Sequence, residues 1–391
     1  MIRSSLSIFG FLLLNLLLSV ASPAMAQEED QIKDALVELG RSLFFDTAFS
    51  DSRNLACATC HDPDQGFVDS RTVSTLAPVS LGSDGKSLGA RNAPTISYLR
   101  LIPSFGINDD NEYIGGFFHD GRAQTLALQA SKPVLDPNEM AMANEAAVME
   151  RLLENPQYVQ SFQSLFGLQV FDNETSAIEG FGKAIAAFER TDLFAPFDSK
   201  YDRYLRGEYS ATLKEEVGMG LFFTPGFTGC NQCHQLELPY AKGEGFTNNL
   251  YENIGVPVNP LLVANGVSAV PDEGLANSPL LASLLDDERD VQKGRFKVPT
   301  LRNVAVTAPY MHNGVFKDLR TVIQFYNKFN GVTQAAQTNP ETKQDWGAAE
   351  VDVNVAEEKL KSLFLTERQI DALMAFLLML TDQRYEHLIE E

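Results

Sequence analysis

Two copies of the pattern C-x-x-C-H constrain this chain more than any other feature. They lie at residues 57–61 and 230–234, and together they use all four cysteines of the 391-residue sequence. In this pattern two thiols add to the vinyl groups of a haem, and the histidine that follows can bind the iron. The alternatives are two redox-active dithiols or a Cys2His2 zinc site, but neither requires a histidine directly after the second cysteine in both copies. The sequence therefore predicts two covalently bound c-type haems, held by the residues Cys57, Cys60, His61, Cys230, Cys233 and His234.

The first 26 residues are typical of a secretory leader. Arg3 precedes an almost wholly apolar run at residues 6–20, and Ala24-Met25-Ala26 has the small-x-small form of a signal-peptidase site. The run is short for a spanning helix and is followed by acidic rather than basic residues. An uncleaved anchor is the alternative. We expect a periplasmic protein with no membrane span in its mature chain.

The size and charge of the mature chain limit its organisation and its partners. Residues 27–391 are too many for one small cytochrome and suit two domains, each with one haem. The chain has 31 basic and 52 acidic residues, and loss of the leader removes only Arg3, so the formal charge changes from −21 to −22. Nucleic acid and anionic membranes are therefore poor partners, whereas a basic face on another protein would be attracted. The alternative is that the charge only maintains solubility.

Most of the chain is predicted to be helical. Apolar residues recur at helical spacing in residues 31–45, 143–154, 176–189, 318–329 and 367–380. Capping boxes open two helices, at Thr212 and at Thr366. The pattern G-x-x-L-F-F precedes each C-x-x-C-H motif, which indicates an internal repeat, and residues 239–300 have the composition of loops. We expect an all-α fold of two cytochrome c-like domains, residues 27–195 and 196–391.

Four further segments resemble a known family. They are RNAPT at residues 91–95, DGRA at 120–123, FKVPTLRN at 296–303 and TAPYMHNG at 307–314. With the two haem motifs, their order and spacing resemble the bacterial di-haem cytochrome c peroxidases and the related MauG proteins, which mature tryptophan tryptophylquinone. The resemblance implies that hydrogen peroxide is reduced at the N-terminal haem, while the C-terminal haem passes or stores oxidising equivalents.

The resemblance also implies two catalytic residues. Gln129 would lie in the distal pocket and orient peroxide, and Glu139 follows ten residues later, with Pro133 between them. A carboxyl group at Glu139 could take the proton from one peroxide oxygen and return it to the other, because desolvation in a haem pocket raises its pKa. By sequence alone, Glu139 also fits a surface acid at a helix start.

Two departures from the family pattern concern the iron ligands. Residues 62–90 contain no histidine, so the first haem is expected to be five-coordinate or water-bound and open to peroxide without prior reduction. Fourteen residues after His312, where the peroxidases place methionine, this chain has Tyr326, as MauG does. A phenolate is a hard donor that stabilises ferric iron. A core tyrosine is the alternative.

A third departure lies between the haems, where the family usually has tryptophan and this chain has His119. Histidine is harder to oxidise, so strong coupling of the irons is in doubt; His119 could be an inter-domain hydrogen-bonding residue or a haem ligand in some redox state. The resemblance further implies a calcium ion bound by Asn92 and the carbonyl groups of Thr307 and Pro309.

Three functions remain open at this point. The first is a periplasmic peroxidase fed by a small electron-donor protein, either a cytochrome c or a cupredoxin. The second is a MauG-like oxidase that uses peroxide to modify aromatic residues of a partner protein. The third is a plain di-haem electron-transfer cytochrome, against which Glu139 counts.

Overall fold

The computed structural model describes residues 23–74, 78–236, 243–267 and 271–389. The predicted leader lies outside the described residues except for its last four, which form the start of helix α1 (Pro23–Phe44). Cleavage after Ala26 would therefore remove the first turn of α1. Within the described part of the chain, no helix is both long enough and apolar enough to cross a membrane.

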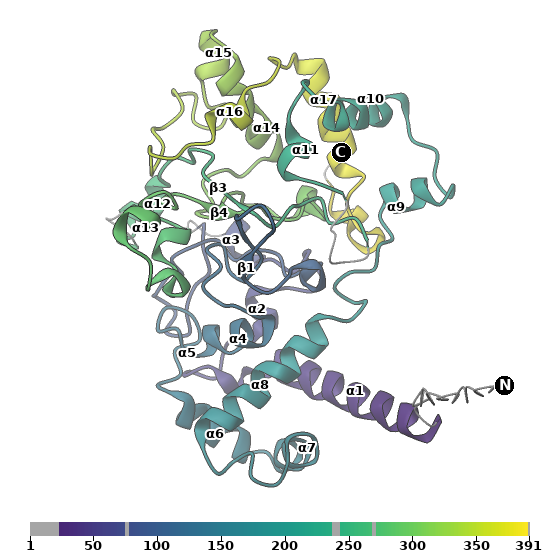
Figure 1. The fold of residues 1–391 in the computed structure, drawn as a ribbon, viewed down its shortest axis with the longest axis vertical. Helices are drawn as coiled ribbons and strands as arrows, with labels where there is room; N and C mark the ends of the chain where they lie inside the picture. Colours follow the sequence, from purple (N-terminus) through teal and green to yellow (C-terminus); the bar gives the residue numbers. More distant parts are fainter. Residues whose placement is uncertain (1–22, 75–77, 237–242, 268–270, 390–391) are drawn as a thin grey trace, which may run out of the picture.

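Two helix pairs of the same design form the frame of the molecule. In the first, α1 packs on α8 (Glu174–Glu189), and in the second, α10 (Leu213–Phe223) packs on α17 (Glu367–Leu378). Figure 1 shows the first pair at the bottom of the molecule and the second at the top. A Cβ atom on Gly40 would lie 1.9 Å from the carbonyl oxygen of Ala184, and one on Gly218 would lie 2.0 Å from that of Ala372. The repeated glycine thus lets each pair approach closely.

Shorter elements connect the two pairs. In the N-terminal half they are α2 (Cys57–Cys60), α3 (Arg71–Ser74), β1 (Gly106–Ile107), β2 (Tyr113–Ile114), α4 (Leu126–Ala130), α5 (Lys132–Leu135), α6 (Glu145–Leu153) and α7 (Pro156–Phe166). In the C-terminal half they are α9 (Lys200–Leu205), α11 (Cys230–Cys233), β3 (Tyr251–Glu252), α12 (Pro260–Ala264), α13 (Asp286–Asp290), β4 (Phe296–Lys297), α14 (Leu319–Asn327), α15 (Gln334–Gln337) and α16 (Glu357–Leu360). Short 3-10 helices include Thr47–Phe49, Leu99–Leu101, Val304–Val306 and Gln383–Leu388.

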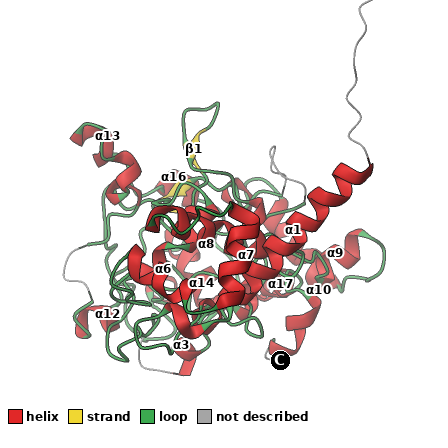
Figure 2. Ribbon diagram, turned by 90° about the horizontal axis from the view of Figure 1, so that it is seen from below, coloured by secondary structure: helices red, strands yellow, loops and turns green. Residues whose placement is uncertain are grey.

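The mainly helical prediction is confirmed, with a small correction. The periodic segments fold as α1, α6, α8, α14 and α17, and both predicted capping boxes form, at Thr212 and at Thr366. Figure 2 shows helices and loops with little strand. Among the described residues there are nevertheless two antiparallel sheets, β1 with β2 and β3 with β4, which the all-α prediction did not include. Each strand is two residues long, too short for sequence alternation to reveal.

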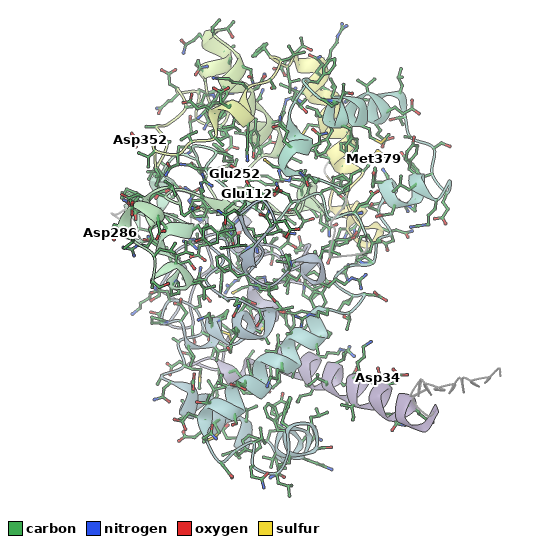
Figure 3. All side chains as sticks on the ribbon, in the orientation of Figure 1. Asp34, Glu112, Glu252, Asp286, Asp352 and Met379 are labelled. Atoms are coloured by element: carbon green, nitrogen blue, oxygen red, sulfur yellow. The ribbon has the colours of Figure 1, made fainter. Side chains whose placement is uncertain are left out.

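The two largest hydrophobic cores of the described residues lie in the two halves of the chain. One is built from buried residues between Leu39 and Phe194, and the other from buried residues between Tyr201 and Leu380. Asp34, Asp286 and Asp352 are exposed acidic residues; Figure 3 shows Asp286 and Asp352 on one side of the molecule and Asp34 on the other. The division into domains at residue 195 stays a prediction.

The two halves meet through a pair of crossed hydrogen bonds. The Asn92 amide donates to the carbonyl oxygen of His312, and the Lys297 amide donates to that of His119, both at 2.8 Å. Each acceptor lies in a tight turn of the same form, closed by Phe117 N to Ala123 O in one half and by Tyr310 N to Phe316 O in the other. The interface is thus built from corresponding parts of the two repeats.

Candidate haem sites and peroxidatic pocket

The first C-x-x-C-H motif forms helix α2, which ends at the partly buried His61. The Nδ1 atom of His61 lies 3.2 Å from the carbonyl oxygen of Phe67. This contact holds the ring by Nδ1 and leaves Nε2 free to bind a metal. Burial lowers the pKa of His61, so the ring is neutral, as a metal ligand must be.

The second motif repeats this arrangement in α11. The Nδ1 atom of His234 lies 3.0 Å from the carbonyl oxygen of Phe246, and burial lowers its pKa to about 4. Gly229, with φ of 70°, precedes the motif in the left-handed conformation that glycine adopts most easily. Both histidines therefore present Nε2 as the free nitrogen.

The four cysteines are free thiols rather than disulfides. Burial raises the pKa of all four thiols, to about 12 for Cys60 and about 11 for Cys233. A redox-active dithiol needs the opposite, a thiol with a lowered pKa. The environment of the cysteines therefore disfavours the dithiol alternative.

Residues of both motifs line one continuous cavity of about 930 Å³. It is lined by the six predicted haem-attachment residues Cys57, Cys60, His61, Cys230, Cys233 and His234, and also by Tyr326. Its walls are mainly apolar, as a haem pocket requires. The residues present therefore fit two covalently held haems, with a histidine on one side of each.

Glu139 lies at the wall of this cavity, on the loop that follows α5. The loop is fixed by two hydrogen bonds, from the Glu139 amide to the carbonyl oxygen of Asp136 at 3.1 Å and from the Ser83 amide to that of Glu139 at 2.7 Å. Gly82 packs so closely that a Cβ atom there would lie 2.6 Å from the carbonyl oxygen of Asn138. The backbone of Glu139 is therefore held from both sides.

The electrostatic environment of Glu139 suits proton transfer. Burial, together with the charge of Asp136, raises the pKa of Glu139 to about 7, and Arg122 only partly opposes this. Arg122 is itself paired with Asp120 at 3.0 Å and stacks on Phe118. A carboxyl group with a pKa near neutrality can both accept and return a proton.

Gln129 lies on α4 and also lines the cavity. The side chain of Thr125 caps α4 by accepting a hydrogen bond from the Leu128 amide at 3.3 Å, and the Gln129 amide donates to the carbonyl oxygen of Thr125 at 3.0 Å. Helix α4 packs on α8, where Gly182 permits close contact with the carbonyl group of Ala127. Gln129 therefore lies on a helix that is held by its cap and by α8, and it lines the same cavity as Glu139.

Tyr326 lies on α14 and lines the cavity near the second motif. Burial raises its pKa, and the nearby Cys233 and Cys230 add to this effect. The proximity of the two cysteines places the phenol beside the C-terminal haem site. The raised pKa keeps the phenol protonated at neutral pH.

The internal repeat explains why the two sites differ. The interface turns are followed by Thr125, which caps α4, and by Asp318, which caps α14. Eight residues after each cap the chain reaches Pro133 in the N-terminal half and Tyr326 in the C-terminal half. A proline side chain has no atom that can bind a metal. At the position in the repeat where the C-terminal site has Tyr326, the N-terminal site therefore has no metal ligand.

Two histidines occupy corresponding positions at the interface. The Nε2 atom of His119 lies 3.0 Å from the carbonyl oxygen of Asn92, and burial followed by the charge of Arg91 lowers its pKa to about 3. His312 stacks on Phe296 at 3.7 Å, and its Nε2 lies 3.4 Å from the carboxylate of Glu350. Both line the cavity, and His119 is held by a hydrogen bond.

Sequence reasoning did not identify an ion-pair bridge at this interface. Arg91 contacts Asp120 at 2.7 Å in its own half and Asp272 at 2.6 Å in the other half, and only 14% of its side chain is exposed. Asp272 lies in the predicted loop region, 181 residues away, with no motif around it. Arg91 was visible only as part of a family segment.

Of the predicted calcium ligands, Asn92 and Pro309 contact each other, and the calcium site itself stays a prediction. The side-chain nitrogen of Asn92 donates to the carbonyl oxygen of Pro309 at 2.6 Å, and the hydroxyl group of Thr307 bonds to its own helix at Val304. Within the described ranges, no group of three or more His, Cys, Asp or Glu side chains could hold a metal. An ion would require the Asn92 amide to turn its oxygen inward; the carbonyl donors themselves suit calcium.

Comparisons with known proteins agree with this geometry. Residues 34–210 match the family model described as di-haem cytochrome c peroxidase. The chain is 47% identical over 380 residues to the methylamine utilization protein MauG of Paracoccus denitrificans, with 96% of each protein covered. The chain belongs to the di-haem cytochrome c peroxidase family. Membership of this family implies two c-type haems and an oxidoreductase.

Other members support the same family fold. The cytochrome c551 peroxidase of Nitrosomonas europaea is 32% identical over 291 residues, which cover 74% of this chain and 72% of that protein. The solved structure of the diheme peroxidase BthA from Burkholderia thailandensis superimposes on the present structure with a TM-score of 0.78. The two sequences are 32% identical, and the superposition covers 91% of this chain and 88% of BthA.

Proposed function

We propose that this protein is a periplasmic di-haem peroxidase that reduces hydrogen peroxide at the N-terminal haem. The observation that carries the proposal is Glu139, a carboxyl group with a pKa of about 7 at the wall of the cavity that receives the His61 motif. Pro133 stands where the other half has Tyr326, which supports an open coordination position. An electron-transfer cytochrome needs neither feature.

Separate residues of the chain would bind the haems, orient peroxide and transfer its proton. When bound, each haem supplies an iron atom that can accept a peroxide oxygen or carry oxidising equivalents. Gln129 would orient peroxide by hydrogen bonds, and Glu139 would take a proton from one peroxide oxygen and return it to the other, so that water can leave. His61 would hold the first iron, and His234 and Tyr326 would hold the second.

Calcium belongs to the same proposal. Asn92, with the carbonyl groups of Thr307 and Pro309, would bind the ion where the two halves meet. Such a site would stiffen the interface through which charge must pass between the haems.

The second candidate is an oxidase that modifies aromatic residues of a partner protein. It is favoured by the 47% identity to a MauG protein over nearly the whole chain and by the tyrosine at position 326. A peroxidase would instead take electrons from a small cytochrome c or cupredoxin. The two functions share the peroxide step and differ in the electron source.

The deciding experiment mixes the fully oxidised protein with stoichiometric peroxide, without reductant, and follows optical and electron paramagnetic resonance spectra. We expect an immediate reaction of the wild type and a loss of about 10²–10⁴ in rate for Glu139→Gln, the range for a general acid–base residue. Glu145→Gln, on the N-terminal turn of α6, is the control. An unchanged rate in Glu139→Gln would remove the catalytic role. A reaction that starts only after one haem is reduced would remove the open first site.

A further inference from the structure

Tyr98 is a buried tyrosine that the proposed peroxide chemistry does not use. It is 1% exposed and lines the haem cavity. The internal repeat pairs it with Asn303: Thr95 bonds to the carbonyl oxygen of Gly66, and Thr300 bonds to that of Gly245. Three residues after each threonine, the chain enters the left-handed conformation, with φ of 61° at Tyr98 and 62° at Asn303.

The hydroxyl group of Tyr98 donates to a buried carboxylate. Its oxygen lies 2.5 Å from Oδ1 of Asp382, a residue that is itself 0% exposed. The other carboxylate oxygen accepts a hydrogen bond from the side-chain nitrogen of Asn303 at 2.8 Å, and the Asp382 amide donates to the Asn303 side-chain oxygen at 2.8 Å. The short O–H···O distance is typical of a charge-assisted bond. Asp382 is thus fixed as the acceptor for the phenolic proton.

On the N-terminal side, Tyr98 connects to the loop behind the first haem site. Its amide donates to the carbonyl oxygen of Phe194 at 2.8 Å. The ring of Phe194 stacks on Phe67 with 4.4 Å between centroids. The carbonyl oxygen of Phe67 is the partner of His61 Nδ1. A short packed route therefore joins Tyr98 to the first iron ligand.

On the C-terminal side, a corresponding route reaches the second haem site. The guanidinium carbon of Arg302 lies 5.2 Å from the ring centroid of Tyr98 and 5.2 Å from that of Phe246. The carbonyl oxygen of Phe246 is the partner of His234 Nδ1. Tyr98 therefore stands between the loops that hold the two proximal histidines.

We propose that Tyr98 is a redox-active tyrosine that relays single oxidising equivalents between the two haem sites, with Asp382 as its proton acceptor. The relay rests on the proposed peroxidase function, in which peroxide supplies the oxidising equivalents. One electron leaves the phenol toward the oxidised N-terminal site, the O–H bond breaks, and the proton crosses to Asp382 Oδ1. An electron arriving from the C-terminal side restores the phenol, and the proton returns.

The surroundings favour a neutral radical. The positive charge of Arg302 near the ring disfavours a radical cation, so electron and proton must leave together. Burial raises the pKa of Asp382 to about 6, and the hydrogen bonds from Tyr98 and Asn303 oppose this. Asp198 and Arg302 are the other charged groups that act on it. Asp382 is therefore ionised, and able to take the proton, above about pH 6.

His119, by contrast, is poorly equipped for this role. Its Nε2 bonds to a backbone carbonyl oxygen, which cannot take up a proton, and imidazole is harder to oxidise than phenol. Of these two groups near the interface, Tyr98 is therefore the one suited to a redox relay.

The test is electron paramagnetic resonance of samples frozen within milliseconds of peroxide addition, in wild type, Tyr98→Phe and Tyr385→Phe. Tyr385 is a matched control, because it is equally buried but donates to the carbonyl oxygen of Pro63 at 2.8 Å. We expect a tyrosyl signal, narrowed by ring-deuterated tyrosine, in the wild type and in Tyr385→Phe but not in Tyr98→Phe. An equal signal in Tyr98→Phe would overturn the relay.

Two further measurements use the wild-type protein alone. The tyrosyl signal should weaken as the pH falls below about 6, and a constant yield from pH 5 to pH 8 would contradict Asp382 as the acceptor. Flash oxidation with ruthenium tris-bipyridine generates the oxidant without peroxide. A tyrosyl radical that forms after flash oxidation but not after peroxide addition would support the relay and contradict the peroxidase function. No radical in either arm would overturn the relay.

Discussion

At the scale of single residues, the proposed function depends on how burial changes the pKa values of ordinary side chains. Glu139, Tyr326 and Asp382 are common residues whose pKa values all rise because water is removed from around them. Arg122 near Glu139 and Arg302 near Asp382 only partly oppose this effect. For Glu139 the raised pKa of about 7 means that the protonated carboxyl group is present at neutral pH, where a carboxyl group in water is ionised.

The pKa of Glu139 predicts the pH dependence of peroxide consumption. Only the carboxylate can accept the first proton, so we expect the rate to rise with pH through about 7 and to level off above it. Initial rates from pH 5 to pH 9 measure this. Glu139→Gln should lose the inflection as well as the rate; a wild-type profile that is flat through pH 7 would contradict the assignment.

Tyr326→Phe tests the ligand of the second haem. Removing the phenol oxygen should convert the low-spin ferric signal of that haem to a different one, because the iron loses a hard anionic donor. Tyr310→Phe is the control, since that buried hydroxyl group in the same half donates to the carbonyl oxygen of Val304 at 2.9 Å. Identical low-spin spectra in wild type and Tyr326→Phe would exclude ligation.

At the scale of elements, the repeated helix pair buries corresponding phenylalanines in the two halves. Phe44 and Phe222, from the two G-x-x-L-F-F segments, are buried against Phe188 of α8 and Phe376 of α17, with ring centroids 5.4 and 5.1 Å apart. The close packing at each glycine turns these rings toward the partner helix. The same local design therefore supports both sites.

Helix α10 offers a matched pair of glycines to test this packing. In Gly218→Ala the new methyl group would meet the backbone of α17, so we expect destabilisation by about 1–3 kcal/mol or more. In Gly220→Ala nothing lies within 4 Å of the new methyl group, and better helix propensity should stabilise the protein by up to about 1 kcal/mol. Denaturant unfolding of the haem-loaded protein measures both. Equal changes in the free energy of unfolding for the two variants would show that close packing of α10 on α17 does not contribute to stability at Gly218.

At the scale of the whole molecule, the two halves are joined by polar contacts. The crossed bonds of Asn92 and Lys297, the bridge at Arg91 and the Tyr98–Asp382 bond all connect the two halves. Tyr98 and Asp382 are buried, so loss of one of them leaves the other unpaired at a high cost.

Arg91→Ala tests the bridge and gives it a defined pH dependence. Burial alone would raise the pKa of Asp272, but the hydrogen bonds and charge of Arg91 lower it to about 2, and they also contribute to the lowered pKa of Asp120. Because these pKa values are depressed in the folded state, the bridge stabilises the protein above the unfolded value of about 3.9, and this is lost as the pH falls toward 2.

We therefore expect Arg91→Ala to lower the free energy of unfolding by about 3–5 kcal/mol at pH 7, the usual cost of breaking a buried ion pair. The difference in this free energy between the variant and the wild type should shrink as the pH falls toward about 2. Arg53→Ala breaks an exposed pair with Glu154 and should cost at most about 1 kcal/mol. Urea unfolding at several pH values provides the comparison. A pH-independent difference would mean that Arg91 acts through packing instead.

Calcium removal is the second test at this scale. If an ion joins Asn92 to the carbonyl groups of Thr307 and Pro309, rigorous chelation should lower the melting temperature and change the haem spectra, and added calcium should restore both. Full activity and unchanged spectra after chelation would count against the site.

How much of this protein can be read from the sequence depends on the range of each interaction. The haem motifs, the helix periodicity and the capping boxes act within a few residues, so the sequence predicted them, and the structure has those helices and caps. The two-residue strands were missed because their pairing joins segments too short to leave a pattern, such as Tyr251 with Lys297. Gln129, Glu139 and Tyr326 were reached through the family resemblance rather than through local pattern.

By itself, the sequence determined which atoms can hold two haems, because covalent attachment and the adjacent histidine are encoded in five consecutive residues. Only the tertiary structure decided how those sites are tuned. Asp272 reaches Arg91 across 181 residues, and Asp382 reaches Tyr98 across 284. The physical reason is that desolvation and Coulomb forces depend on distance in space, and the fold alone sets that distance.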